Sequence, residues 1–278
     1  MSKRICMVVL LVAAACTRAA AFSCLDYCGH YGGKNFKACM KTCGMGVEDF
    51  MGTRSVDGKY CPKNMSYIPA GSFIMGCTDG DKNCYGDELP ARLVQITKGF
   101  CMDRFEVTQE SYYRVMERNP SRSLWCGSNC PVDSVTWADA HNYCKKIGKR
   151  LPTESEWEYA AKAGTTTKFY WGGLKSDAFA WYDENSFGRS HSIGKKLPNA
   201  YALNDMAGNV AEWVKDCYDA NWYGQIPGKN PIDKNRKCMA RTVRGGSWRF
   251  PITGLRVSDR TPRDPAFGYL DTGFRCAQ

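Results

Sequence analysis

The sequence predicts a mixed α+β, disulfide-rich domain with little regular secondary structure. Three observations carry this prediction. The chain has 278 residues and 16 cysteines, and removing Cys6 and Cys16 with an export leader leaves 16 − 2 = 14, an even number. Two short helices with capping boxes follow one another in the middle of the chain. An ordered series of motifs, described below, runs over residues 61–278 and accounts for the expected strands and irregular loops.

Residues 1–21 have the composition of a secretory signal peptide. A basic pair at residues 3–4 precedes an apolar run over residues 5–15, and small residues end in Ala19-Ala20-Ala21. The run is shorter than the roughly 20 apolar residues that a bilayer span needs. A second processing site also fits, because the residues before Cys16 form a loose lipobox, and cleavage there would leave a lipid anchor. Both sites predict export to the periplasm, the outer envelope of a bacterium or the exterior, with a lipid on Cys16 as the only membrane contact expected.

Cysteine usage and charge restrict the class of protein. Exported proteins use abundant, even-numbered cysteines as disulfides, whereas cytosolic proteins use them in metal or redox sites. The formal net charge is +10, and cleavage after Ala21 removes Lys3, Arg4 and Arg18, which leaves 38 − 3 = 35 basic against 28 acidic residues, or +7. The charges are interspersed without a block of one sign, so a solvated surface is expected and a nucleic-acid groove is not.

Residues 22–45 are predicted to form a cysteine-rich cap, a twin CX3C helical hairpin. Its two cysteine pairs have i,i+4 spacing, which places each pair on one face of a helix. Facing helices would be joined by two disulfides, Cys24 with Cys43 and Cys28 with Cys39. A zinc site of four thiolates, or of three with His30, is the alternative, and export favours the disulfides. Residues 46–60 are expected to be a linker.

Local capping signals predict three short helices after the linker. Thr108 is a suitable N-cap for the first. Residues 136–139 (Thr-Trp-Ala-Asp) are an acidic variant of the capping box, and apolar residues then recur at helical spacing until Gly148 provides a stop. Residues 153–156 (Thr-Glu-Ser-Glu) form a second capping box, and the helix that follows is expected to end at Gly164.

A long ordered match gives the chain a family resemblance. The motifs that carry it are, in order, MSYIPAGSFIMG (65–76), FCMDRFEVT (100–108), GKRLPTESEWEYA (148–160), DMAGNVAEW (205–213), RGGSW (244–248) and TGFRC (272–276). In this order they resemble the formylglycine-generating enzyme family, the sulfatase-modifying factors. The resemblance covers residues 61–278 and implies that family's fold, an irregular α+β structure with a C-type-lectin-like core, braced by turns, disulfides and calcium.

The oxidases of this family place two copper-binding cysteines just after the Gly-Gly-Ser, and this chain has none there. Counted from Ser247, the two thiol positions fall at Phe250 and Leu255, and no cysteine lies between Met239 and Arg275. Copper(I) prefers thiolate ligands, which neither hydrocarbon side chain supplies. The resemblance therefore implies the scaffold without the copper chemistry, so no copper is expected and no catalytic residue is assigned.

The corresponding loop instead carries aromatic and arginine side chains, which binding hot spots favour. The expected binding surface is Ser247, Trp248, Arg249, Phe250, Arg256, Arg260, Arg263 and Asp264. Packing of Trp248 under the loop is the structural alternative for that residue. The favoured function is an exported, non-catalytic binding module for a peptide, protein or glycan. The alternative is an oxidoreductase of the same family, formylglycine-generating or another metal-dependent oxidation, that uses an unrecognised site.

The family binds calcium at the turn that residues 205–213 resemble. Carried across by position, Asp205 and Glu212 donate side-chain oxygens, and Gly208 and Val210 donate carbonyl oxygens. Calcium takes roughly six to eight oxygen ligands, so this turn would supply several of them. The ion would brace the fold, and a plain turn without metal is the alternative.

Ten cysteines remain in residues 61–278, and spacing alone does not fix their connectivity. The resemblance implies one bridge, Cys144 with Cys276. Proximity along the chain favours three more: Cys77 with Cys84, Cys126 with Cys130, and Cys217 with Cys238. The two cysteines left over, Cys61 and Cys101, would then pair with each other.

Overall fold

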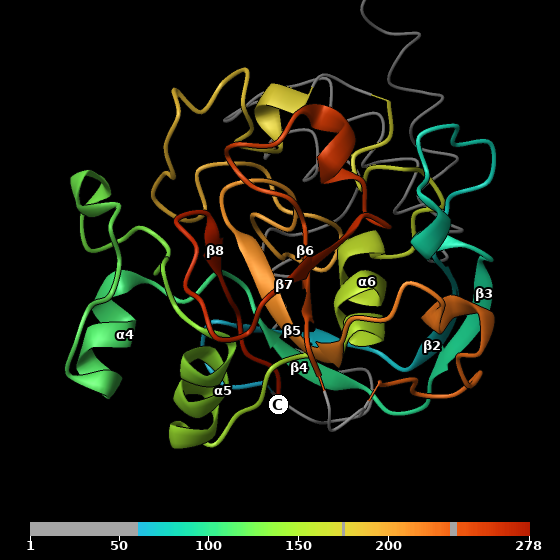
Figure 1. The fold of residues 1–278 in the computed structure, drawn as a ribbon, viewed down its shortest axis with the longest axis horizontal. Coiled ribbons are helices and arrows are strands. Elements are labelled where there is room, and N and C mark those ends of the chain that lie inside the picture. The colour runs from blue at the N-terminus through green and yellow to red at the C-terminus, as the bar shows by residue number, and fades with distance from the viewer. Residues whose placement is uncertain (1–60, 174–175, 234–237) are drawn as a thin grey trace, which may run out of the picture.

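The described part of the chain is a body of short helices and strands joined by long loops (Figure 1). The computed structural model describes residues 61–173, 176–233 and 238–278. The signal peptide, cap and linker expected over residues 1–60 lie outside the described residues. The elements are β1 (Met65–Ile68), β2 (Gly71–Met75), β3 (Arg92–Ile96), β4 (Phe100–Asp103), α4 (Gln109–Met116), α5 (Trp137–Lys146), α6 (Glu154–Lys162), β5 (Ala211–Cys217), β6 (Arg241–Arg244), β7 (Arg260–Arg263) and β8 (Thr272–Gly273). The predicted α+β class with little regular secondary structure is confirmed.

The strands form three small sheets rather than one large one. β1 pairs with β4 and β2 pairs with β3, both antiparallel, and the third sheet has the order β7-β6-β5-β8. In the third sheet β8 runs parallel to β5, while β6 and β7 are antiparallel to their neighbours. β5 is the centre of this sheet and is buried along nearly its whole length. Its first residues are the end of the motif at residues 205–213, which therefore enters the core.

The three predicted helices begin at the predicted caps. The Thr108 hydroxyl accepts from the backbone of Ser111 at the start of α4. Complete capping boxes open α5 at Thr136 and α6 at Thr153. α6 ends at Lys162, two residues before the expected Gly164, because Ala163 itself adopts the left-handed conformation, with φ of 45°. A Thr cap accepts a hydrogen bond from a backbone N–H three residues away, which explains why these helix starts were predictable from sequence.

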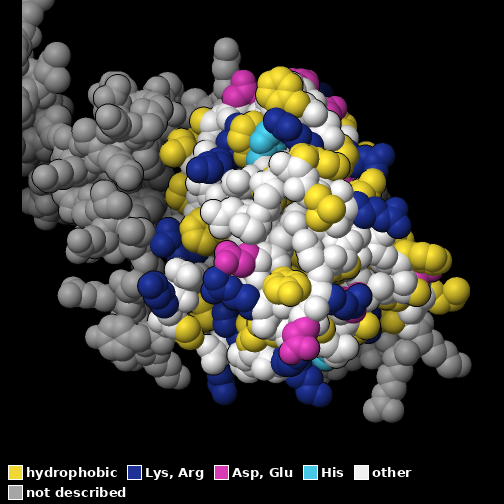
Figure 2. Space-filling model, turned by 90° about the vertical axis from the view of Figure 1, so that its left-hand side faces the viewer, with side chains coloured by type: hydrophobic (Ala, Val, Ile, Leu, Met, Phe, Trp, Pro, Cys, Tyr) yellow, Lys and Arg dark blue, Asp and Glu magenta, His cyan; other side chains and the backbone are white. Residues whose placement is uncertain are grey.

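Charged side chains on the described surface are mixed in sign. Figure 2 views the side on which α4 lies in Figure 1, and basic, acidic and apolar side chains are interspersed on it. The apolar side chains on this face stand among polar groups rather than as one continuous sheet of hydrocarbon. This arrangement agrees with the interspersed charges of the sequence.

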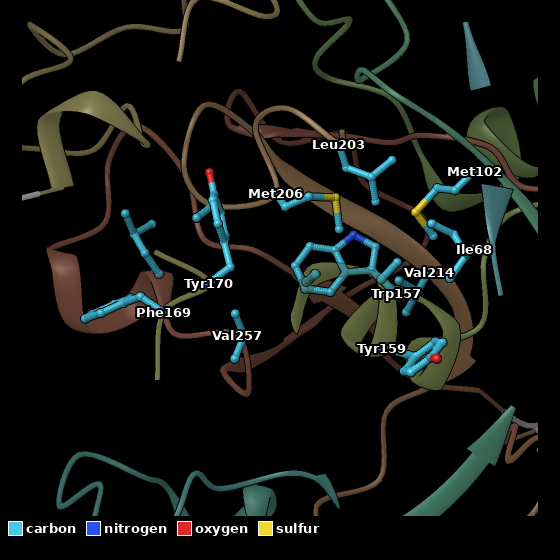
Figure 3. Packing of buried hydrophobic residues seen from close by; sticks show 14 of the residues in the cluster. Ile68, Met102, Trp157, Tyr159, Phe169, Tyr170, Leu203, Met206, Val214 and Val257 are labelled. Atoms are coloured by element: carbon cyan, nitrogen blue, oxygen red, sulfur yellow. The ribbon is translucent and has the colours of Figure 1, made fainter. Parts of the chain in front are cut away.

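The core is built around two fully buried tryptophans. Trp157 of α6 lies among Leu203, Met206 and Val214 (Figure 3) and is 0% exposed. Its indole Nε1 donates to Glu212 Oε2 over 2.8 Å, which ties α6 to β5. A buried Trp N–H needs such a partner, because an unpaired polar group in the core is costly. The equivalent residue of the second cluster, Trp213 on β5, donates to a backbone carbonyl in the same way.

Five disulfides cross-link the described chain. They join Cys61 to Cys101, Cys77 to Cys84, Cys126 to Cys130, Cys144 to Cys276, and Cys217 to Cys238. These are the pairs expected from resemblance, proximity and the two cysteines left over. So many disulfides indicate an oxidising, exported environment. Among the described helices, none combines the length and the apolar character that crossing a bilayer requires.

Candidate functional site

The loop after β6 is shaped by two glycines in the left-handed region. Gly245 has φ of 89° and Gly246 has φ of 63°, a conformation that side chains with a Cβ rarely adopt. A Cβ on Gly246 would also collide with the carbonyl oxygen of Gly254. The loop segments at Gly246 and Gly254 therefore approach each other closely. This closure leaves residues 248–251 at least partly exposed.

Phe250 and Leu255, where the sequence resemblance places the two copper thiolates, have hydrocarbon side chains. Leu255 is 1% exposed and belongs to the main core cluster, against which the partly buried Phe250 packs. The backbone carbonyl of Phe250 accepts from the N–H of Asp183, which holds the neighbouring loop in place. All ten cysteines of the described residues are in disulfides. Within the described chain, no free thiol remains to bind copper.

Three residues expected on the binding surface are instead buried, and the expectation is wrong for them. Ser247 is 0% exposed and donates to Asp271 Oδ2 over 2.9 Å. Arg256 is 1% exposed and forms two hydrogen bonds of 2.6 Å to the carboxylate of Glu88. Arg260 lies 4% exposed against Glu154, with contacts of 2.6 and 3.1 Å.

Long-range carboxylate partners explain this burial. A guanidinium leaves water only when a carboxylate satisfies its charge and N–H groups, preferably in a bidentate geometry. Glu88 lies 168 residues before Arg256 in the chain, and Glu154 lies 106 residues before Arg260. Such separations leave no local sequence signal. Arg256 consequently ties its loop to the segment of Glu88, Arg260 ties β7 to α6, and neither arginine is available to a ligand.

The other residues of the expected surface stay at least partly accessible. Trp248 and Phe250 are half-buried, and Arg249 is exposed with its guanidinium 5.5 Å from the centroid of the Trp248 ring. Arg263 is partly engaged, because it forms a bidentate pair with Asp271 at 2.8 and 3.0 Å. The exposed Asp264 accepts from a backbone N–H within its own turn.

A neighbouring loop that sequence inspection missed lies against Trp248. The Ser186 hydroxyl donates to the carbonyl of Trp248 over 2.8 Å, and the next residue, Phe187, is 84% exposed. The indole Nε1 of Trp248 is buried and has no hydrogen-bond partner within the described residues. We call Trp248, Arg249, Phe250 and Phe187 the aromatic loop surface. Phe187 has a positive φ of 57°, which is unusual for a bulky residue, and the sequence gives no sign of this conformation.

Asn209 connects the segments beneath this surface. Its backbone donates to Trp181 and accepts from Trp248, and its side-chain oxygen accepts from the N–H of His191. The His191 and Trp181 rings stack with centroids 3.8 Å apart. Asn209 is 0% exposed and has φ of 54°, which asparagine tolerates better than most residues. It therefore positions three aromatic segments from the interior.

The expected calcium donors lie in one turn next to a buried arginine. Glu212 Oε1 accepts from Arg275 Nε and Nη2 over 2.9 and 2.7 Å. Glu212 Oε2 accepts from Arg275 Nε and from Trp157 Nε1, both over 2.8 Å. A carboxylate has about four acceptor positions, so those of Glu212 are filled by protein donors. Glu212 would join a metal only by giving up part of this arrangement.

Asp205 fits a cation better than Glu212 does. Its Oδ2 accepts from the Gly194 N–H over 2.7 Å, whereas its buried Oδ1 has no hydrogen-bond partner in the described structure. Burial raises the pKa of Asp205 to about 6. Burial and the charges of Asp205 and Glu212 raise the pKa of Glu106 well above its ordinary value. No group of three or more His, Cys, Asp or Glu side chains in the described residues has metal-binding geometry, so backbone carbonyls would have to complete a site.

Comparisons with known proteins cover most of the described chain. Residues 53–278 match the model of the sulfatase-modifying factor enzyme 1-like domain, starting inside the predicted linker. A serine/threonine-protein kinase pkn1 of Chlamydia pneumoniae is 32% identical over an alignment of 250 positions, gaps included, which covers 77% of this chain and only 38% of that protein. The formylglycine-generating enzyme of Thermomonospora curvata is 28% identical over an alignment of 283 positions, gaps included, which covers 77% of this chain and 93% of that enzyme.

Two further similarities bear on activity and fold. The inactive C-alpha-formylglycine-generating enzyme 2 of Bos taurus is 32% identical over 173 residues, 53% of this chain and 50% of that protein. The solved structure of PvdO from Pseudomonas aeruginosa superimposes with a TM-score of 0.68 and 29% identity, covering 77% of this chain and 93% of that one.

Proposed function

Because the chain belongs to the family of sulfatase-modifying factor enzyme 1-like domains, we propose that it is an exported, non-catalytic member that binds a peptide, protein or glycan at its aromatic loop surface. One observation carries the proposal. Phe250 and Leu255 stand in the two thiolate positions, in a described chain whose cysteines are all in disulfides. Copper(I) has no soft ligand there, and the copper-dependent oxidation of a peptide cysteine has no site.

The comparisons support a member without catalysis. The bovine relative carries the word inactive in its name, so loss of activity has a precedent among the proteins that this chain resembles. The five disulfides support export, since they persist in oxidising compartments. A lipid on Cys16 would tether the domain to a membrane, and cleavage after Ala21 would release it.

The aromatic loop surface has the composition of a binding site. Phe187 exposes 84% of its side chain, and Arg249 presents a guanidinium with no carboxylate partner in the described structure. Aromatic and arginine side chains dominate binding hot spots because they combine apolar area with directional hydrogen bonds.

A direct assay tests the absence of catalysis. The mature protein is incubated with copper(I), reductant and a Cys-x-Pro-x-Arg peptide, and the peptide mass is followed. The Thermomonospora curvata enzyme serves as positive control, and the double variant Phe250→Cys, Leu255→Cys is run in parallel. We expect the wild-type chain to leave the peptide unchanged. Conversion of the cysteine to formylglycine by the wild type would contradict the proposal and support the oxidoreductase alternative.

A structural calcium ion at the turn of residues 205–212 also belongs to this proposal. Supporting it are the free Oδ1 of Asp205 and the excess of carboxylates, since Glu106, Asp205 and Glu212 face the single guanidinium of Arg275. Asp205 and the carbonyls of Gly208 and Val210 would hold the ion, and Glu212 would join by yielding an Arg275 contact. Bound calcium would neutralise the excess negative charge and brace the fold.

A further inference from the structure

A pocket that shares no residue with the aromatic loop surface lies between the first turn of α4 and the loop that the Cys126–Cys130 disulfide closes. Its volume is about 320 Å³, close to the lower end of the range for small-molecule pockets. The residues lining it are Gln109, Glu110, Tyr113, Asn119, Leu124, Gly127 and Ser128. α4 and its neighbouring loops lie on the side of the molecule shown in Figure 2.

The walls of this pocket are fixed before any ligand binds. The N–H groups of Gln109 and Glu110 donate to the carbonyls of Cys130 and Ser128, at 2.9 and 3.1 Å, which joins the helix to the disulfide loop. The Gln109 side chain, 4% exposed as a residue, donates Nε2 to the Ser123 carbonyl over 3.1 Å. The Asn119 amide donates to Gln109 Oε1 over 3.0 Å. A preorganised polar wall reduces the entropy lost on binding.

The two amides retain hydrogen-bonding capacity for a ligand. Each amide nitrogen carries two hydrogens, and the structure uses one on Gln109 and one on Asn119. The Glu110 carboxylate uses one oxygen, Oε1, for Arg114 and retains Oε2 as an acceptor. Adjacent planar donors and acceptors of this kind match neighbouring hydroxyl groups, each of which both donates and accepts.

The mouth of the pocket is apolar and aromatic. Tyr113 is 59% exposed and Leu124 is 66% exposed, and the adjacent Trp125 is 58% exposed. Exposed large side chains that gather at a polar pocket indicate a binding surface. An aromatic face favours flat patches of C–H groups in a ligand.

The lining excludes the other common ligand classes. None of the described residues that line the pocket is Lys, Arg or His, so an anion finds no counter-charge in it. The Glu110 charge is already paired with Arg114, so a cation finds little net attraction. A purely apolar ligand would bury the free amide hydrogens without partners, which is unfavourable.

We propose that this pocket binds a neutral polyhydroxylated ligand, a hexose-type sugar residue of a glycan. Hydroxyl groups on one edge of the ring meet the Gln109 and Asn119 amides and Glu110. The C–H face of the ring packs on Tyr113, with Trp125 in reach of the next residue. The proposal stands independently of the aromatic loop surface, since the pocket shares no residue with it.

The test titrates a panel of neutral methyl glycosides (gluco, galacto, manno and N-acetylgluco) with the mature protein by ligand-observed NMR. We expect saturable binding of at least one glycoside, with a Kd on the order of 1 mM, weak as expected for so small a ligand. Tyr113→Ala should weaken it at least tenfold, and Tyr113→Phe should retain it. Phe267→Ala, a matched control at an aromatic residue that is 62% exposed elsewhere, should change nothing.

Two outcomes would overturn the proposal: no glycoside of the panel binds, or Tyr113→Ala leaves the affinity unchanged. A variant of the other surface, Trp248→Ala, separates the two proposals. If Trp248→Ala abolishes glycoside binding while Tyr113→Ala does not, the sugar belongs to the aromatic loop surface, and only the inference about the α4 pocket fails.

Discussion

Arg275 lies along the carboxylate of Glu212 inside the core, with Nη2 2.7 Å from Oε1 and Nε 2.8 Å from Oε2. Both side chains are at most 1% exposed. The pair joins the C-terminal segment to β5, and it occupies the carboxylate that the family's calcium turn would use. Because neither charge can reach water, each depends on the other.

Removal of one partner should therefore be costly. Glu212→Gln is expected to lower the free energy of unfolding by about 3–5 kcal/mol, because it leaves the Arg275 charge buried without a counter-charge. Urea unfolding with intact disulfides measures the loss. Arg114→Met, in an exposed pair with Glu110, is the control and should change stability by less than about 1 kcal/mol. Equal losses for the two variants would contradict the buried-pair assignment.

Calcium binding should depend on pH through Asp205. Its folded pKa, raised to about 6, lies above its ordinary value, so the folded state holds a proton between about pH 4 and 6 that the unfolded chain has released. In the absence of metal, this residue therefore makes stability fall as pH rises through that window. Calcium competes with the proton, so the thermal shift that calcium produces should be large at pH 7.5 and small at pH 5.

The matched variant is Asp205→Asn, which tolerates the positive φ of 56° at this position. It keeps an acceptor oxygen while removing the charge, and it should abolish the pH dependence of the calcium effect. A melting temperature of the wild type that is the same in excess calcium and in excess chelator at pH 7.5 would rule out the proposed ion.

Asn209 should be required for the order of the aromatic loop surface. Asn209→Gly keeps a backbone that accepts positive φ, but deletes the contacts to the His191 N–H and to Glu106 Oε2, at 2.9 and 2.8 Å. We expect faster amide exchange in residues 186–193 and a loss of stability of about 2 kcal/mol. Hydrogen exchange with mass spectrometry measures residues 186–193 and, as the control region, α6, which should remain protected. Unchanged exchange in residues 186–193 would show that Asn209 does not hold them.

Removal of the longest-range and of the shortest-range described disulfide should lower the stability of the protein by different amounts. Cys144–Cys276 closes a separation of 132 residues, and Cys126–Cys130 closes one of four. On chain entropy alone, replacing both cysteines of the longer bridge by alanine should lower the free energy of unfolding by about 5 kcal/mol. The same replacement in the shorter bridge should lower it by about 2 kcal/mol. Thermal unfolding of the two double variants compares them. A larger loss for the shorter bridge would mean that native packing, not chain entropy, sets the cost.

Much of the fold could be predicted because its signals are local. Thr136 and Thr153 cap helices through N–H groups three residues away, and Cys77 and Cys84 pair within one loop. The absence of cysteine around Phe250 and Leu255 was likewise visible in the sequence. It removes the copper ligands in any conformation of the loop.

The sequence by itself thus determined the helix starts, the fold family and the missing thiolates, since each depends on residues near one another or on the residue type alone. Only the tertiary structure decided which arginines are available. Arg256 and Arg260 were expected on the binding surface, yet their ion pairs with Glu88 and Glu154, far away in the chain, bury them in the core. Burial of a charge depends on a partner brought near by the whole fold, and no local pattern encodes that partner.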